Sequence, residues 1–142
     1  MRALLDVNVL IALLDAAHVH HGRARAWLAA NVRHGWASCP ITENGCVRIL
    51  SQPAYPGHVT PAQAATLLRE ATLTRHHAFL PDDASLLDEA AFEWRSLLTP
   101  RQLTDAYLLA LASRHGACFA TFDERVALAA VPGAGSRHLV VI

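Results

Sequence analysis

Short apolar segments alternate with helical patterns along the whole chain, and this alternation limits the fold more than any other feature. Apolar residues at helical spacing, such as Ala24, Trp27 and Leu28, fill the stretches between these segments. Parallel strands need a helical connection of this kind, and a sheet covered by helices on both faces has strands that are apolar throughout. The sequence therefore predicts an α/β fold, a three-layer α/β/α sandwich with a mostly parallel central sheet flanked by helices. The expected strands are 2–5, 36–39, a weak one within 76–83, 117–121 and 138–142.

The helices are expected between these strands, and two of them have clear start signals. Thr60 is followed by Pro61 and Gln63, and Thr99 is followed by Pro100 and Gln102. Each triplet combines a capping residue, a first-turn proline and a reciprocal capping side chain. The second of these helices is strongly apolar and should run to Gly116. The expected helices lie within 8–15, 20–35, 46–50, 61–73, 85–98 (one helix or a pair), 103–116 and 123–131.

The length of 142 residues predicts a single domain, 1–142, with one core. Hydrophobic residues make up 53% of the chain, but no apolar run approaches the eighteen residues of a membrane span. Asp6 interrupts the N-terminal apolar run, which excludes a typical signal peptide and predicts a cytoplasmic location, as in bacteria. Three cysteines without Cys-x-x-Cys spacing favour neither disulfides nor a zinc site, and we expect them to be buried.

The formal net charge is zero, and all twelve basic residues are arginines. This balance argues against an indiscriminate polyanion binder, although arginine suits local phosphate recognition. The absence of lysine also argues against enzymes that need a lysine beside a phosphate, including P-loop nucleotide hydrolases.

Four acidic residues follow or lie near the ends of expected strands. Asp6 follows the strand 2–5 directly, and Asp123 comes shortly after the strand 117–121. Glu43 opens the helix after the strand 36–39, and Asp105 lies near the start of an apolar helix. The carboxyl ends of parallel strands share one edge of a sheet, where ligand sites form. We therefore expect these acids to meet at that edge.

Carboxylates in apolar surroundings need a cation, because burial and mutual repulsion both favour the protonated form. Oxygen-only ligands suit Mg²⁺, for which Mn²⁺ can substitute. Such a centre is typical of phosphodiester hydrolysis, in which the metal screens charge and activates water. Asn8 and Thr121 are candidates to support the acids as hydrogen-bonding partners.

These residues resemble those of a known family. The segments LLDVNVLIAL, PITENGCVRILSQP, LTDAYLLALA and ATFDERV occur in this order at the spacing of PIN-domain ribonucleases of the VapC type, the toxins of toxin–antitoxin pairs. The resemblance covers nearly the whole chain. It implies that Asp6, Glu43, Asp105 and Asp123 form the acidic metal site, supported by Asn8 and Thr121.

The resemblance also implies what the protein acts on and what it binds. The expected substrate is RNA, either a transfer RNA or a ribosomal RNA loop, and cleavage is expected to inhibit translation. The expected partners are a cognate VapB-type antitoxin and a second copy of the chain in a homodimer, with no membrane.

Each acid also has an ordinary structural interpretation when considered alone. Asp6 could cap the following helix, Glu43 and Asp105 could be first-turn acids, and Asp123 could be a turn residue. His18, His20 and His21 lack zinc-site spacing and are expected to be exposed. Arg48 could contact RNA or pair with an acid.

Two other functions are compatible with parts of this pattern. A phosphatase with Asp6 as its covalent nucleophile would need a second aspartate at Asn8 and a lysine, both absent. A PIN-like module that binds RNA or a protein without cutting it would keep the acids without turnover.

Overall fold

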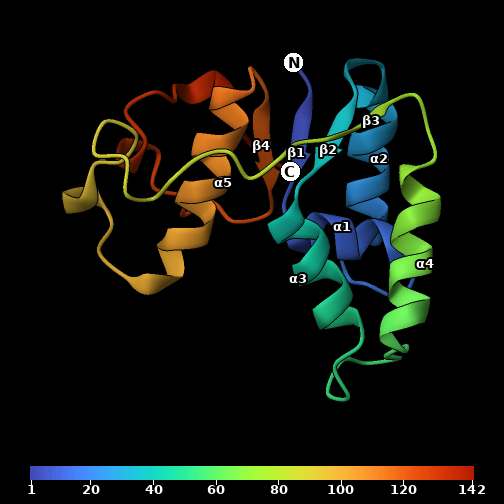
Figure 1. The fold of residues 1–142 in the computed structure, drawn as a ribbon. Coiled ribbons are helices and arrows are strands. Elements are labelled where there is room, and N and C mark those ends of the chain that lie inside the picture. Colours follow the sequence, from blue (N-terminus) through green and yellow to red (C-terminus); the bar gives the residue numbers. More distant parts are fainter.

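Five strands form one parallel sheet at the centre of the computed structural model, which describes residues 1–142 (Figure 1). The strand order is β3-β2-β1-β4-β5, and every neighbouring pair is parallel. All five expected strands are confirmed. Their bounds are β1 Ala3–Leu5, β2 Trp36–Ser38, β3 His77–Phe79, β4 Cys118–Thr121 and β5 Leu139–Val141.

Helices cover both faces of the sheet (Figure 1). They are α1 Val7–Leu14, α2 His21–Asn31, α3 Pro40–Leu50, α4 Pro61–Thr72 and α5 Leu103–Arg114. Short 3₁₀ turns occur at η1 Val32–His34, η2 Trp94–Ser96, η3 Pro100–Gln102, η4 Leu128–Ala130 and η5 Ser136–His138. None of the helices combines the length and the apolar composition that crossing a membrane requires.

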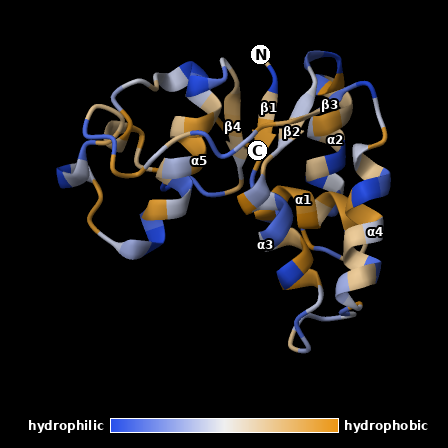
Figure 2. Ribbon diagram, in the orientation of Figure 1, coloured by the Kyte–Doolittle hydropathy of each residue, from blue (hydrophilic) through white to orange (hydrophobic).

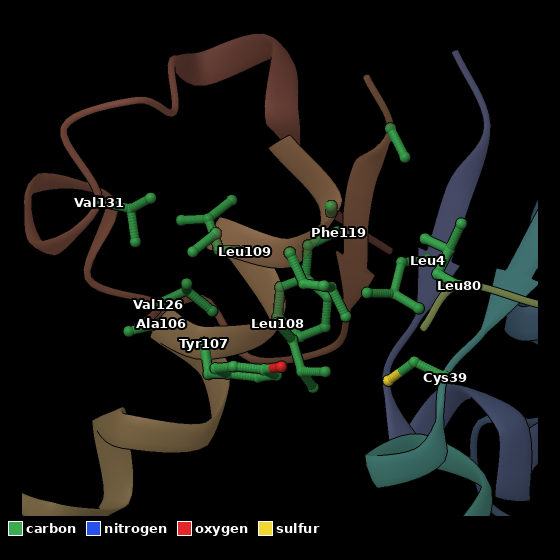
Figure 3. Packing of buried hydrophobic residues seen from close by; sticks show 14 of the residues in the cluster. Leu4, Cys39, Leu80, Ala106, Tyr107, Leu108, Leu109, Phe119, Val126 and Val131 are labelled. Carbon is green, nitrogen blue, oxygen red and sulfur yellow. The ribbon is translucent and has the colours of Figure 1, made fainter. Parts of the chain in front are cut away.

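Two apolar clusters lie on opposite faces of the sheet, because successive strand residues point in opposite directions. Leu4 and Phe119 pack with Leu108 of α5 in one cluster (Figure 3). Leu5 packs with Val9 and Cys46 in the other, beneath α1, α3 and α4, and α1 is among the most hydrophobic helices (Figure 2). The predicted three-layer sandwich is therefore confirmed. All three cysteines are buried and free, as expected.

The start signals read from the sequence form real caps. The Thr60 hydroxyl accepts the Gln63 N–H, and Gln63 Oε1 accepts the Thr60 N–H, at 3.2 and 2.9 Å. At η3, Gln102 Oε1 accepts the Thr99 N–H at 3.1 Å, as Gln63 Oε1 does for Thr60. Gly116 ends the last helix with a φ of 63°, a conformation that glycine adopts easily.

Two expected helices are wrong. Residues 85–98 form turns with only the 3₁₀ turn η2, and residues 123–131 contain only η4. In both stretches side chains bind nearby backbone groups: Asp88 accepts the Ala90 N–H, and Asp123 accepts the Arg125 N–H. Such local bonds compete with the helical ladder. Their apolar side chains still reach the core, since Phe92 and Val126 are buried.

Helix α3 begins six residues earlier than the expected segment 46–50, because a cap forms behind it. Thr42 Oγ1 accepts the Cys39 N–H at 2.9 Å, and Pro40 occupies the first turn. Glu43 lies in the first turn of α3, at the opening of the helix as expected.

Gly45 lets α3 pack closely against α1. A Cβ at this position would lie 2.7 Å from Cγ2 of Val7, a side chain with little rotational freedom. We expect Gly45→Ala to lower the free energy of unfolding by about 1–2 kcal/mol in urea denaturation, as overpacking exceeds the gain in helix propensity. Val7→Ala should relieve the clash in the double variant. Gly22→Ala, on α2 with open space around it, should instead be neutral or stabilising.

Candidate active site

The register of β1 and β4 brings Asp6 and Thr121 together at the carboxyl edge of the sheet. Leu5 pairs with Ala120, so the next residue of each strand lies at the same level. Thr121 Oγ1 donates a hydrogen bond to Asp6 Oδ2 at 2.7 Å. Asp6 Oδ1 accepts the Val7 N–H at 2.7 Å, so Asp6 also caps α1. Only 7% of Asp6 is exposed.

Burial raises the pKa of Asp6 above its usual value. The hydrogen bonds from Thr121 and Val7 oppose this shift, and the negative charge of Asp123 adds to it. The cap interpretation and the site interpretation of Asp6 are compatible, because the hydrogen bonds to its two oxygens supply no positive charge to balance the carboxylate.

Asp105 lies in the first turn of α5, near Asp6 and Asp123. Burial, together with the charges of these two carboxylates, raises the pKa of Asp105 to about 6. The positive charge of Arg125 acts in the opposite direction. A carboxyl group with such a pKa is a typical feature of functional sites that hold a cation or exchange a proton.

Asp123 is bound by an arginine of its own loop. Arg125 Nε and Nη2 donate to the two oxygens of Asp123, each at 3.0 Å. These bonds lower the pKa of Asp123. The Asp123 N–H also donates to Thr121 Oγ1, at 3.1 Å, which ties the start of this loop to the partner of Asp6.

A pocket of about 310 Å³ opens beside these acids. Asp105 and Asp123 line it together with Arg101 and Arg125. Its remaining lining residues are Leu98, Thr99 and Gln102. A cavity that joins carboxylates to guanidinium groups offers places for both a cation and a phosphate.

Glu43 lies at the same edge but has different neighbours. Its Oε1 accepts a hydrogen bond from the buried Ser38 hydroxyl at 2.6 Å, and His77 Nε2 lies 2.8 Å from the same hydroxyl. The carboxylate lines a second pocket, of about 450 Å³, which also contains Arg69 of α4. Glu43 is not among the charges that raise the pKa of Asp6 or Asp105. The charges of Asp6 and Asp123 thus act on Asp105, whereas the hydrogen bond of Glu43 is to Ser38.

Asn8 is exposed and makes no side-chain hydrogen bond to Asp6, whose oxygens are bound by Val7 and Thr121. Arg48 is exposed and forms no ion pair. Sequence reasoning missed Arg125 and Ser38. Arg125 could have been found from its position two residues after Asp123, and Ser38 from its position at the end of β2.

The donor set fits a hard divalent cation chemically, although its side chains are not gathered around one. No group of three or more His, Cys, Asp or Glu side chains is arranged closely enough to hold a metal ion. Asp6 and Asp105 nevertheless supply oxygen ligands whose ionised forms are disfavoured by burial and mutual repulsion. A cation reverses both effects, and Mg²⁺ takes such ligands together with waters. Asp123 could join them once released by Arg125.

Comparison with known proteins identifies the family. The PIN domain family model matches residues 3–132. The chain is 54% identical to Ribonuclease VapC44 of Mycobacterium tuberculosis over the full length of both. It is 44% identical to Ribonuclease VapC38 of the same species, over 87% of this chain and 86% of that protein.

Solved structures share the fold at lower sequence identity. VapC20 of Mycobacterium tuberculosis, described as a Sarcin-Ricin loop cleaving toxin, superposes with a TM-score of 0.62 at 19% identity, over 93% of this chain and 98% of that one. The structure of VapBC2 from Rickettsia felis, bound to a DNA fragment from their promoter, superposes with a TM-score of 0.64 at 14% identity. The match covers 100% of this chain and 98% of that one. The predicted family is therefore confirmed: the chain belongs to the PIN-domain family, as a VapC-type ribonuclease toxin.

Proposed function

We propose that this ribonuclease hydrolyses RNA phosphodiester bonds with Mg²⁺, or Mn²⁺ in its place, held by Asp6 and Asp105. The observation that supports this most directly is the placement of the buried Asp6 and of Asp123 beside Asp105, which together with burial raises the pKa of Asp105 to about 6. Such a group is ionised at neutral pH at a cost that a bound cation removes. The pocket beside it has the mixed charge that a metal and a phosphate group need.

The supporting residues have roles that follow from their contacts. Thr121 fixes one oxygen of Asp6, which leaves the orientation of the carboxylate well defined. Ser38 orients Glu43, which we assign to positioning or deprotonating water. Asp123 is a further metal ligand, or supports the site through hydrogen bonds. Asn8 has no contact that assigns it a role. When bound, a divalent ion supplies charge screening of the phosphodiester and a more acidic water.

The substrate and partners belong to the same proposal. One structurally similar protein is described as cleaving the Sarcin-Ricin loop, and another is a VapBC pair. We propose a structured transfer RNA or a ribosomal RNA loop as the substrate, so that cleavage inhibits translation. Such RNA lies in the cytoplasm, where the protein would act. We also propose neutralisation by a VapB-type antitoxin and a homodimeric state, which sedimentation velocity can test.

RNA cleavage with controlled metal tests the proposed activity. The purified protein should cut total bacterial RNA in Mg²⁺ or Mn²⁺ and leave it intact in excess EDTA, and sequencing of the new RNA ends should show a small set of sites. A protein that binds RNA but leaves it intact in both metals would contradict the proposal and favour the non-cutting module.

A further inference from the structure

Three aromatic rings form a ladder that ends beside the acids. The rings of His18 and His20 have centroids 5.7 Å apart, and those of His20 and Phe122 lie 4.7 Å apart at an angle of 37°. Phe122 stands between Thr121 and Asp123 in the chain, at the carboxyl edge of the sheet. The ladder therefore joins the α1–α2 loop to the site that holds Asp6 and Asp105.

The rings are placed where a ligand can reach them. Phe122, His20 and His18 are all partly exposed, although Phe122 also packs against the apolar cluster beneath α1. The guanidinium carbon of the exposed Arg23 lies 5.7 Å from the centroid of the Phe122 ring. Aromatic rings and an arginine, next to a site for phosphodiester chemistry, form the combination that binds single-stranded nucleic acid.

The loop that carries the histidines is held in position before any ligand binds. The Tyr55 hydroxyl donates to Asp15 Oδ2, and Asp15 Oδ1 accepts the Ala17 N–H at 2.9 Å. The His20 N–H donates to His18 Nδ1 at 3.1 Å. His21 Nδ1 donates to the carbonyl of Ala12 at 2.7 Å, which anchors the start of α2 to α1. A platform ordered in this way binds a base with little further loss of conformational freedom.

We propose that Phe122 and His20 stack a base of single-stranded RNA next to the cleaved phosphodiester bond, with Arg23 at an adjoining phosphate. The proposal rests on the proposed function and deepens it, because it places a nucleotide relative to the acids. Stacking accepts every base, since each has a π-face. The ladder thus selects unpaired nucleotides, as in loops, and leaves the choice of sequence to other contacts.

RNA binding under conditions that prevent cleavage tests the platform. The probe is a fluorescein-labelled single-stranded oligoribonucleotide, with Ca²⁺ in place of Mg²⁺ and a gel to confirm that it stays intact. We expect Phe122→Leu and His20→Ala each to weaken its binding about 5- to 100-fold in fluorescence anisotropy. Trp94→Leu is the matched control, because the ring of Trp94 lies against that of Phe92, with centroids 6.3 Å apart, and lines neither pocket beside the acids. This control should bind like the wild type, and thermal melting should show all three variants folded.

Photocrosslinking adds a result that a purely structural role would not produce. The same RNA carrying 4-thiouridine should crosslink at Phe122 or His20 itself, as located by tandem mass spectrometry within the tryptic peptides 115–125 and 3–23. Wild-type affinity in both variants, or crosslinks only at other residues, would overturn the platform while RNA cleavage by the wild type still stood. A wild type that neither binds nor cuts RNA would overturn both proposals.

Discussion

Replacing Asp6 by asparagine is expected to reduce metal-dependent RNA cleavage by about 1000-fold. The substitution keeps the shape of the side chain and its place between the Val7 N–H and the Thr121 hydroxyl, but removes the negative charge. Because the remaining acids then hold a divalent ion weakly, the charge stabilisation of the transition state is lost, a loss of several kcal/mol. Single-turnover cleavage of a defined RNA measures the effect, at a fixed Mg²⁺ concentration that saturates the wild type.

A control for this experiment is Asp88→Asn, the same substitution at an exposed position. Asp88 accepts the Ala90 N–H in a turn and has no contact with the acidic edge. This variant should cut RNA at the wild-type rate. Cleavage by the Asp6 variant at a similar rate would show that the ion is held elsewhere.

Replacing Asp105 by asparagine should abolish cleavage and yet stabilise the metal-free protein at pH 7, by about 1–2 kcal/mol in the free energy of unfolding. The pKa of Asp105 is about 6 in the folded protein and 3.8 by reference. Each unit of such a shift corresponds to about 1.4 kcal/mol, and partial exposure of the side chain reduces the total. The neutral amide avoids the cost of ionising this group. Urea denaturation in EDTA measures the difference.

The pH dependence of stability provides the corresponding test. Since the folded pKa of Asp105 is raised, its stabilising contribution is complete below pH 3.8 and is lost as the pH rises through about 6. The Asp105 variant should lack this loss, whereas Asp88→Asn should retain it. Mn²⁺ should stabilise the wild type at pH 7 more than the Asp105 variant, because only the wild type keeps the full ligand set. Equal pH profiles for wild type and Asp105 variant would contradict the shifted pKa.

The convergence of Asp6 and Asp123 could be predicted from the sequence, because each follows an apolar strand and parallel strands share one carboxyl edge. The hydroxyl of Thr121 was found by the same argument, since it ends β4 beside Asp6. The apolar run after Thr99 and Pro100 likewise identified α5 and placed Asp105 in its first turn. Strong periodicity and strand ends therefore carried most of the information about the site.

The remaining features depend on contacts that periodicity does not encode. Glu43 lies at the predicted edge, but its hydrogen bond to the hydroxyl of Ser38 could not be predicted from the spacing of the acids. Residues 85–98 and 123–131 have helical composition, yet local bonds to Asp88 and Asp123 keep them as turns. Arg125 could not be assigned from the sequence, which shows only that it follows Asp123 by two residues. That its guanidinium binds both carboxylate oxygens of Asp123 is seen only in the structure.

Arg125 serves as an internal counter-ion for Asp123. A divalent ion that reached Asp123 would have to replace this guanidinium, so its binding would be an exchange of cations rather than a simple addition. The displaced Arg125 would remain on its short loop at the rim of the same pocket, where an RNA phosphate could accept its hydrogen bonds. Ion loading and substrate capture would then be linked through one side chain.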